Sequence, residues 1–303
     1  MGGGSWKSDN WSNYRRSSGM DRATSAHDIY KSSYTKKEYL PKGIVRESCD
    51  SDEHPNSTPI ILGLDVTGSM GHLLHTMADK LGVTMGEIYK RKPVEDPQVL
   101  FAAIDDYITS DNEALQVTQF ESDIRIAEQM TALRFLRRGG GNGWESYVLA
   151  WYFAAYHTKC DAFKKNKKGI LITMGDDGVQ PILSRTEIKE VFGDTVEKDI
   201  KLDELLSAVN KNWEVFHLTM MEGGSAHSRD IDGWDKVLGS HHIRVEDSSK
   251  IPEIIVSILE KLNGKSTADI VNSWDGSTAI VVGKALEKLE ITTTGADTGV
   301  VMF

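Results

Sequence analysis

One stretch of this chain decides its fold: Pro59-Ile-Ile-Leu-Gly-Leu-Asp65-Val-Thr67-Gly-Ser69-Met70. Residues 59–65 form a short apolar run that ends in an aspartate, as expected of a strand buried on both faces. Small polar residues interrupt the run, and helical spacing follows over roughly 71–90. A buried strand, a tight polar loop and a helix in this order predict the first unit of an α/β fold.

The same alternation continues along the chain. Further strands are predicted at 99–104, 169–174, 213–220 and 242–245, with an edge or hairpin strand at 115–120. Further helices are predicted at 123–136, 146–164, 184–192, 202–211, 233–239 and 251–262. Strands that alternate with helices favour a doubly wound, mostly parallel sheet with helices on both faces. No internal repeat is found.

The ends of the chain differ in composition from its middle. Residues 1–57 are rich in Ser, Asn, Gly, Lys and Asp without a sustained apolar period, which predicts a polar arm, either disordered or laid along the body. Residues 58–263 form the predicted α/β domain. Residues 264–303 are a predicted C-terminal extension, with one helix at about 278–289 and a Thr- and Gly-rich end.

Charge and composition limit the classes of partner. The net charge is −10, and residues 1–47 carry +4, which leaves −14 for the remainder. An acidic body disfavours nucleic acids and anionic membranes as partners. The sequence has no run of 18 or more apolar residues, no apolar signal segment and only two cysteines, Cys49 and Cys160. We therefore expect a cytoplasmic protein.

Oxygen-bearing side chains follow several of the predicted strands. Ligands of doubly wound sheets bind at the carboxyl ends of the strands, so side chains from separate loops can converge there. Oxygen donors without histidine or cysteine suit Mg²⁺, Mn²⁺ or Ca²⁺ rather than zinc. The predicted metal ligands are Asp65, Thr67, Ser69, Asn142, Glu145 and Asp176. Asp106, Trp144 and Asp177 are predicted to form a partner-binding rim around them.

The segment from Asp65 to Ser69 resembles the DxSxS or DxTxS motif of von Willebrand factor A (vWA) domains, their metal-ion-dependent adhesion site. The stretch 103–107 and the loop Gly-Gly-Gly-Asn142-Gly-Trp144-Glu145-Ser are similar to the vWA domains of α-kinase-type proteins and hemicentins. The resemblance covers roughly residues 58–263. It also extends to stand-alone bacterial and phage vWA proteins, which look like assembly factors, often beside AAA+ ATPases.

The resemblance implies a vWA (Rossmann-like) fold and a division of roles within the site. The hydroxyls of Thr67 and Ser69 would bind the metal directly, Asp65 would act through water or a hydroxyl, and a partner's carboxylate would complete the coordination. The loop threonine of the family is absent, and Glu145, or alternatively Asn142, takes its place. Asp176 lies two residues beyond the position of the corresponding family acid. The carboxylate at Glu145 could favour Ca²⁺ or lessen the need for an acid from outside.

These residues also admit other interpretations. Thr67 or Ser69 could simply cap the next helix, and Asp176 could belong to an ordinary turn. The glycine loop lacks the lysine of a phosphate-binding loop. We expect a non-enzymatic, cation-dependent module that binds an acidic group on a partner protein, for example an AAA+ ATPase or an assembly partner. The alternatives are a metal-assisted hydrolase with Asp106 or Asp177 as base, and a structural, virion-type protein with a degenerate site.

Overall fold

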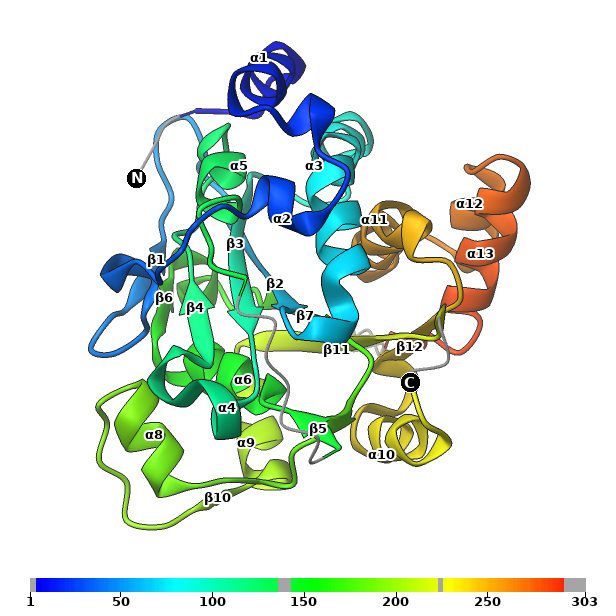
Figure 1. Cartoon of the computed structure of the whole chain (residues 1–303). Coiled ribbons are helices and arrows are strands. Elements are labelled where there is room, and N and C mark those ends of the chain that lie inside the picture. Colours follow the sequence, from blue (N-terminus) through cyan, green and yellow to red (C-terminus); the bar gives the residue numbers. More distant parts are fainter. Residues whose placement is uncertain (1–3, 136–142, 223–225, 292–303) are drawn as a thin grey trace, which may run out of the picture.

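The computed structural model describes residues 4–135, 143–222 and 226–291. Its centre is a six-stranded sheet with the order β12-β11-β7-β2-β3-β4 (Figure 1). The strands are β2 (Thr58–Asp65), β3 (Pro97–Ile104), β4 (Leu115–Val117), β7 (Gly169–Gly175), β11 (Trp213–Met220) and β12 (His242–Val245). All neighbours are parallel except β3 and β4, which pair antiparallel. The predicted doubly wound, mostly parallel α/β fold is confirmed, and β4 is the predicted edge strand.

The sheet is buried on both faces because its strands are apolar at successive positions. In β2, Ile60, Leu62 and Leu64 belong to one hydrophobic cluster, whereas Ile61 belongs to the other. The first cluster lies against α3 (Gly71–Arg91) and α11 (Ile251–Leu262), and the second lies against α6 (Tyr147–Tyr156) and α9 (Leu202–Val209). Figure 1 shows these two pairs of helices on opposite faces of the sheet.

The remaining segments connect and cover this core. The other helices of the body are α4 (Tyr107–Ser110), α5 (Arg125–Met130), α7 (Asp161–Lys164), α8 (Arg185–Val191) and α10 (Ser228–Leu238). In the described part of the chain, three short strand pairs lie outside the central sheet: β1 (Arg46–Ser48) with β6 (Thr158–Cys160), β5 (Trp144–Glu145) with β8 (Gly178–Val179), and β9 (Ile182–Leu183) with β10 (Ile200–Lys201). No helix among the described residues combines the length and apolar composition needed to cross a membrane.

Three helix predictions need correction. The predicted helix 146–164 is wrong as a single element, because α6 ends at Tyr156 and residues 158–160 form β6, which pairs with β1 from the N-terminal arm. Helical spacing cannot reveal a pairing partner more than a hundred residues away. The predicted helix 123–136 is limited to α5, and the predicted helix 233–239 begins earlier, at Ser228, where polar residues hide its apolar period.

The N-terminal arm lies along the body. It contains α1 (Ser8–Ser18) and α2 (Ala26–Ile29), which pack near α3 (Figure 1). Its buried apolar residues join the same cluster as α3: Trp6, Trp11, Met20, Ala26, Ile29, Tyr30 and Tyr39. The polar composition of the arm therefore conceals scattered apolar anchors that have no helical period.

The C-terminal segment also packs on the body. Helices α12 (Thr267–Asn272) and α13 (Gly276–Leu286) contact α11, and α12 was not predicted. The guanidinium of Arg91, at the end of α3, lies 3.6 Å from the ring centre of Trp274 and donates a hydrogen bond to Ser273 Oγ at 2.7 Å. The segment is thus fixed to the end of α3 by a cation–π contact and a hydrogen bond.

Gly82 in α3 provides a test of how the arm docks. A Cβ atom at Gly82 would overlap the indole of Trp11, whereas a Cβ at Gly86, one turn later, would meet no atom within 4 Å. We expect Gly82→Ala to lower the free energy of unfolding by about 1–3 kcal/mol through overpacking. Gly86→Ala should raise it by about 0.5–1 kcal/mol, because alanine favours the helix. Urea unfolding measures both, and equal stabilisation by the two variants would contradict the docking of Trp11 on α3.

Candidate functional site

Two acidic residues meet at the carboxyl edge of the sheet. Asp65 is the last residue of β2, and Asp176 directly follows β7. The two strands are parallel neighbours with Leu64 opposite Met174, so their ends lie side by side (Figure 1). Both aspartates are buried, with exposed fractions of 0% for Asp65 and 3% for Asp176. The structure therefore brings these two predicted residues to one place, as the strand-end argument expects.

Three hydrogen bonds from described residues fix the carboxylate of Asp65. Its Oδ1 accepts from the backbone N–H of Thr67 at 2.8 Å and from the Thr67 hydroxyl at 2.6 Å. Its Oδ2 accepts from the hydroxyl of Tyr147, the first residue of α6, at 2.8 Å. Asp65 thus ties the loop after β2 to the start of a helix on the opposite face of the sheet from α3.

The two predicted hydroxyl ligands lie next to each other and next to Asp176. Thr67 Oγ1 is 3.3 Å from Ser69 Oγ, and Ser69 Oγ donates to Asp176 Oδ1 at 3.2 Å. Neither hydroxyl caps a helix: Thr67 precedes the 3-10 turn at 68–70 without a side-chain cap bond, and the residue before α3 is Met70. The helix-cap interpretation is therefore wrong. Ser69 is exposed, so the group of oxygens formed by Thr67, Ser69 and Asp176 is open to solvent at Ser69.

Glu145 reaches the same edge from the small strand pair. It lies in β5, opposite Val179 of β8, which continues the chain after Asp176 and Asp177. Its side chain is buried, and Oε2 has no hydrogen-bond partner among the described residues. A buried carboxylate oxygen without a donor is destabilising unless something else compensates it.

Burial, and then the neighbouring acids, raise the pKa of carboxyl groups at this edge. Burial raises the pKa of Asp65 to about 7, and the charge of Asp176 adds to the effect. Burial also raises the pKa of Glu145 to about 10, with further contributions led by Asp65 and Asp106. The pKa of Asp177 is raised by burial and then by Asp176. Without a cation, these carboxyls therefore hold protons that ordinary surface carboxylates would have lost, and a bound cation would favour their ionised form.

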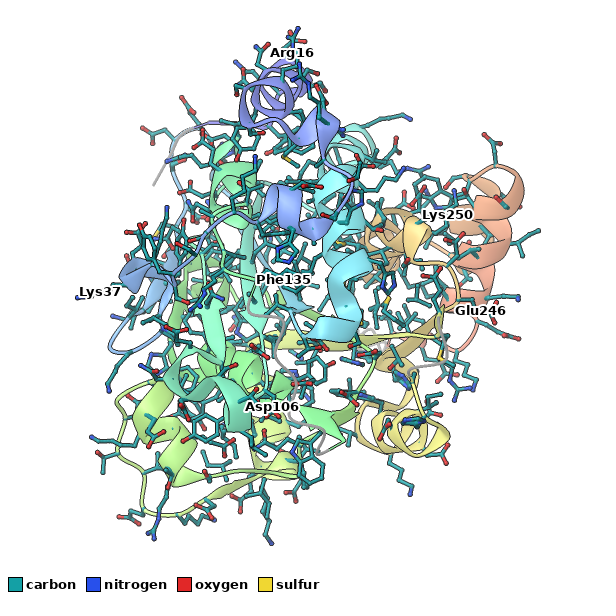
Figure 2. The ribbon with its side chains drawn as sticks, in the orientation of Figure 1. Arg16, Lys37, Asp106, Phe135, Glu246 and Lys250 are labelled. Atoms are coloured by element: carbon teal, nitrogen blue, oxygen red, sulfur yellow. The ribbon has the colours of Figure 1, made fainter. Side chains whose placement is uncertain are left out.

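The aspartates after β3 lie near Glu145 and have hydrogen bonds of their own. Asp105 accepts hydrogen bonds from the backbone of Asp106 at 2.8 Å and from the Ser110 hydroxyl at 2.7 Å. Asp106 caps α4 by accepting from the backbone of Ile108 at 3.0 Å. Figure 2 shows Asp106 in the region of α4. Both aspartates are buried, so simple solvation is not their role. Asp106, which was predicted as a rim residue, caps α4.

The other predicted residues differ in their placement. Trp144 is 36% exposed and lies beside Glu145 in β5. Asp177 is half-buried, and its carbonyl accepts from the indole N–H of Trp234 in α10 at 3.0 Å. Asn142 lies outside the described residues.

The donor set fits a hard divalent cation. Carboxylate and hydroxyl oxygens are the ligands that Mg²⁺, Mn²⁺ and Ca²⁺ prefer, and the unpartnered Glu145 Oε2 leaves one oxygen to be compensated. Across the described ranges, no group of three or more His, Cys, Asp or Glu side chains is arranged to hold a metal. Any cation at Asp65 and Asp176 would therefore depend on the hydroxyls of Thr67 and Ser69.

Tyr147 is a residue of this site that the sequence did not reveal. It is fully buried, and a Cβ atom at Gly175 would overlap its hydroxyl and lie 2.8 Å from Asp65 Oδ2. Gly175 thus allows β7 to approach Asp65 and Tyr147 closely. Its position directly before Asp176 was a signal that the strand end packs tightly, but nothing in the sequence pointed to Tyr147 as the donor.

Comparisons with known proteins give only distant likenesses. No protein-family model and no curated protein matches the chain. Among solved structures, the pilus adhesin SpaC from Lactobacillus rhamnosus GG in its open conformation has a TM-score of 0.46 at 10% identity. This match covers 76% of this chain and 31% of that protein, so the chain corresponds to less than a third of the adhesin.

Two other structures are similarly distant. The conserved protein BatB from Bacteroides thetaiotaomicron has a TM-score of 0.40 at 15% identity, over 69% of this chain and 100% of that one. Proximal thread matrix protein 1 from the mussel byssus has a TM-score of 0.43 at 10% identity, over 68% of this chain and 46% of that one. TM-scores below 0.5 support no family assignment, so the vWA resemblance of the sequence remains a prediction.

Tyr147→Phe tests the hydrogen bond that holds Asp65. The substitution keeps the aromatic ring but removes the only donor that the described residues offer to Asp65 Oδ2, so we expect a loss of about 1–3 kcal/mol in unfolding free energy. Tyr152→Phe in the same helix is the matched control, because its partner Asp194 is 36% exposed and water can replace the lost bond. Urea unfolding in EDTA measures both, and equal losses would contradict a special role for Tyr147.

Proposed function

We propose that this protein is a binding module, not an enzyme, that holds a divalent cation at the carboxyl edge of its sheet and uses it to bind an acidic group of a partner protein. Thr67, Ser69 and Asp176 would hold the cation, and Asp65 would orient Thr67. The cation would supply positive charge and open coordination positions for a carboxylate. Mg²⁺ is the expected ion, with Mn²⁺ or Ca²⁺ as alternatives.

One observation carries this proposal: Ser69 Oγ lies 3.3 Å from Thr67 Oγ1 and 3.2 Å from Asp176 Oδ1. Both distances are long for hydrogen bonds between oxygens, which usually measure about 2.5–3.0 Å. Three oxygens that lie together without short bonds between them are well suited to share a small cation. The three hydrogen bonds that Asp65 already accepts fit a supporting role.

Because this edge is rich in carboxyl groups, we expect it to bind an acidic partner only when a cation is present. In their ionised form, the buried carboxylates of Asp65, Glu145 and Asp176 would repel a partner's carboxylate across the short distances of a contact. A dication between them would turn this repulsion into attraction. Glu145 could also contribute its free oxygen to the cation, which would favour Ca²⁺ and reduce the need for an outside acid.

Ser69→Ala tests the ligand set directly. The exposed serine can lose its hydroxyl without disturbing the core, so the variant should fold but bind Mg²⁺ or Mn²⁺ at least about tenfold more weakly, a change of about 1.4 kcal/mol. Isothermal titration calorimetry measures the affinity. Thermal melting gives an independent reading, because an ion that binds only the folded state raises the melting temperature.

Ser110→Ala is the matched control. Its hydroxyl donates to the buried carboxylate of Asp105 at the same edge, but it lies outside the proposed ligands, so the response to metal should be retained. Equal metal affinity in the wild type and in Ser69→Ala would contradict the proposal. Metal-dependent turnover of a phosphoester would instead favour the metal-assisted hydrolase.

A further inference from the structure

A cleft adjoins the candidate cation site. Its volume is about 340 Å³, at the lower end of the range of ligand pockets. Residues from α4, β5, β9 and the loop before β9 line it, among them Ile108, Trp144, Gln180 and Ile182. Figure 1 shows α4 and β5 toward the same lower end of the molecule.

Several exposed apolar side chains lie in the wall of this cleft. The described residues expose eight large apolar side chains, and three of them, Ile108, Trp144 and Ile182, line the cleft. Their exposed fractions are 63%, 36% and 47%. Scattered exposed apolar residues need no explanation, but a group that converges on one cleft indicates a contact surface.

Gln180 adds an unused polar group to the cleft. Its side-chain nitrogen donates to the carbonyl of Ile182 at 2.7 Å and to Glu187 Oε1 at 2.8 Å. Because both partners are acceptors, the orientation of the amide is fixed, and the acceptor is Oε1. Gln180 is 8% exposed, and its Oε1 has no hydrogen-bond partner within the described structure. A buried acceptor of this kind gains stability when a ligand brings an N–H donor.

The cleft and the cation site share their supporting strands. In β5, Trp144 lines the cleft and the next residue, Glu145, lies at the acidic edge. β8 leads from Asp176 and Asp177 to Gln180. Since β5 and β8 are paired, a peptide bound at the cation site would have the cleft beside it.

We propose that the cleft receives an apolar side chain of the same partner segment whose carboxylate binds at the cation site, with a peptide N–H of that segment donating to Gln180. This inference rests on the proposed function and narrows the partner to a peptide segment with an acidic residue close to an apolar one. Asp106 and Glu187 in the cleft wall disfavour a second acidic side chain there.

Selection from a phage-displayed library of random short peptides tests this specificity. The full chain is presented in Mg²⁺, and the selected peptides are synthesised and titrated calorimetrically against the wild type and two variants. The cleft variant is Ile108→Ser combined with Ile182→Ser. Its matched control is Ile280→Ser in α13, which is 64% exposed and lies outside the cleft.

We expect selected peptides to carry Asp or Glu within two positions of Leu, Ile or Phe, and to lose affinity in EDTA. They should bind the cleft variant at least about tenfold more weakly and bind Ile280→Ser unchanged. Mg²⁺-dependent acidic peptides that bind the cleft variant equally well would overturn this inference and leave the proposed function standing. Peptides that need the cleft but neither an acid nor Mg²⁺ would overturn the proposed function. Failure to select any peptide would count against the inference.

Discussion

A carboxylate that is removed from water must be compensated by hydrogen bonds or by opposite charge, and Asp65 is completely removed from water. Its compensation comes from the backbone and hydroxyl of Thr67 and from the hydroxyl of Tyr147. These bonds fix the loop after β2 against α6. They therefore set the position of the Thr67 hydroxyl, and with it the geometry of the oxygen group that includes Ser69 and Asp176.

The compensation of Asp65 does not extend to the whole edge. Glu145 keeps a buried oxygen without a donor, and its raised pKa reflects both burial and the surrounding acids. The adjoining cleft also has a buried oxygen without a donor, but an uncharged one, the amide oxygen of Gln180. Since β5 and β8 connect the two places, one partner segment could satisfy both the acidic edge and the cleft.

The sequence predicted those parts of the molecule that depend on local patterns. Continuous apolar runs predicted the central strands, and the strand-end rule placed Asp65 and Asp176 together. The rest depends on contacts between distant segments. Pairing of β1 with β6 shortened a predicted helix, and the docking of Trp11 on α3 uses a single aromatic residue in a polar arm. The hydrogen bond from Tyr147 to Asp65 could not be predicted for the same reason, because only the folded chain brings the two residues together.

Diffraction from crystals soaked in MnCl₂, measured for anomalous scattering of manganese, tests the central claim most directly. The account predicts a manganese peak within coordinating distance of Thr67 Oγ1, Ser69 Oγ and Asp176, with Asp65 still bonded to Tyr147. An empty site at saturating Mn²⁺, or manganese bound only elsewhere on the protein, would contradict it.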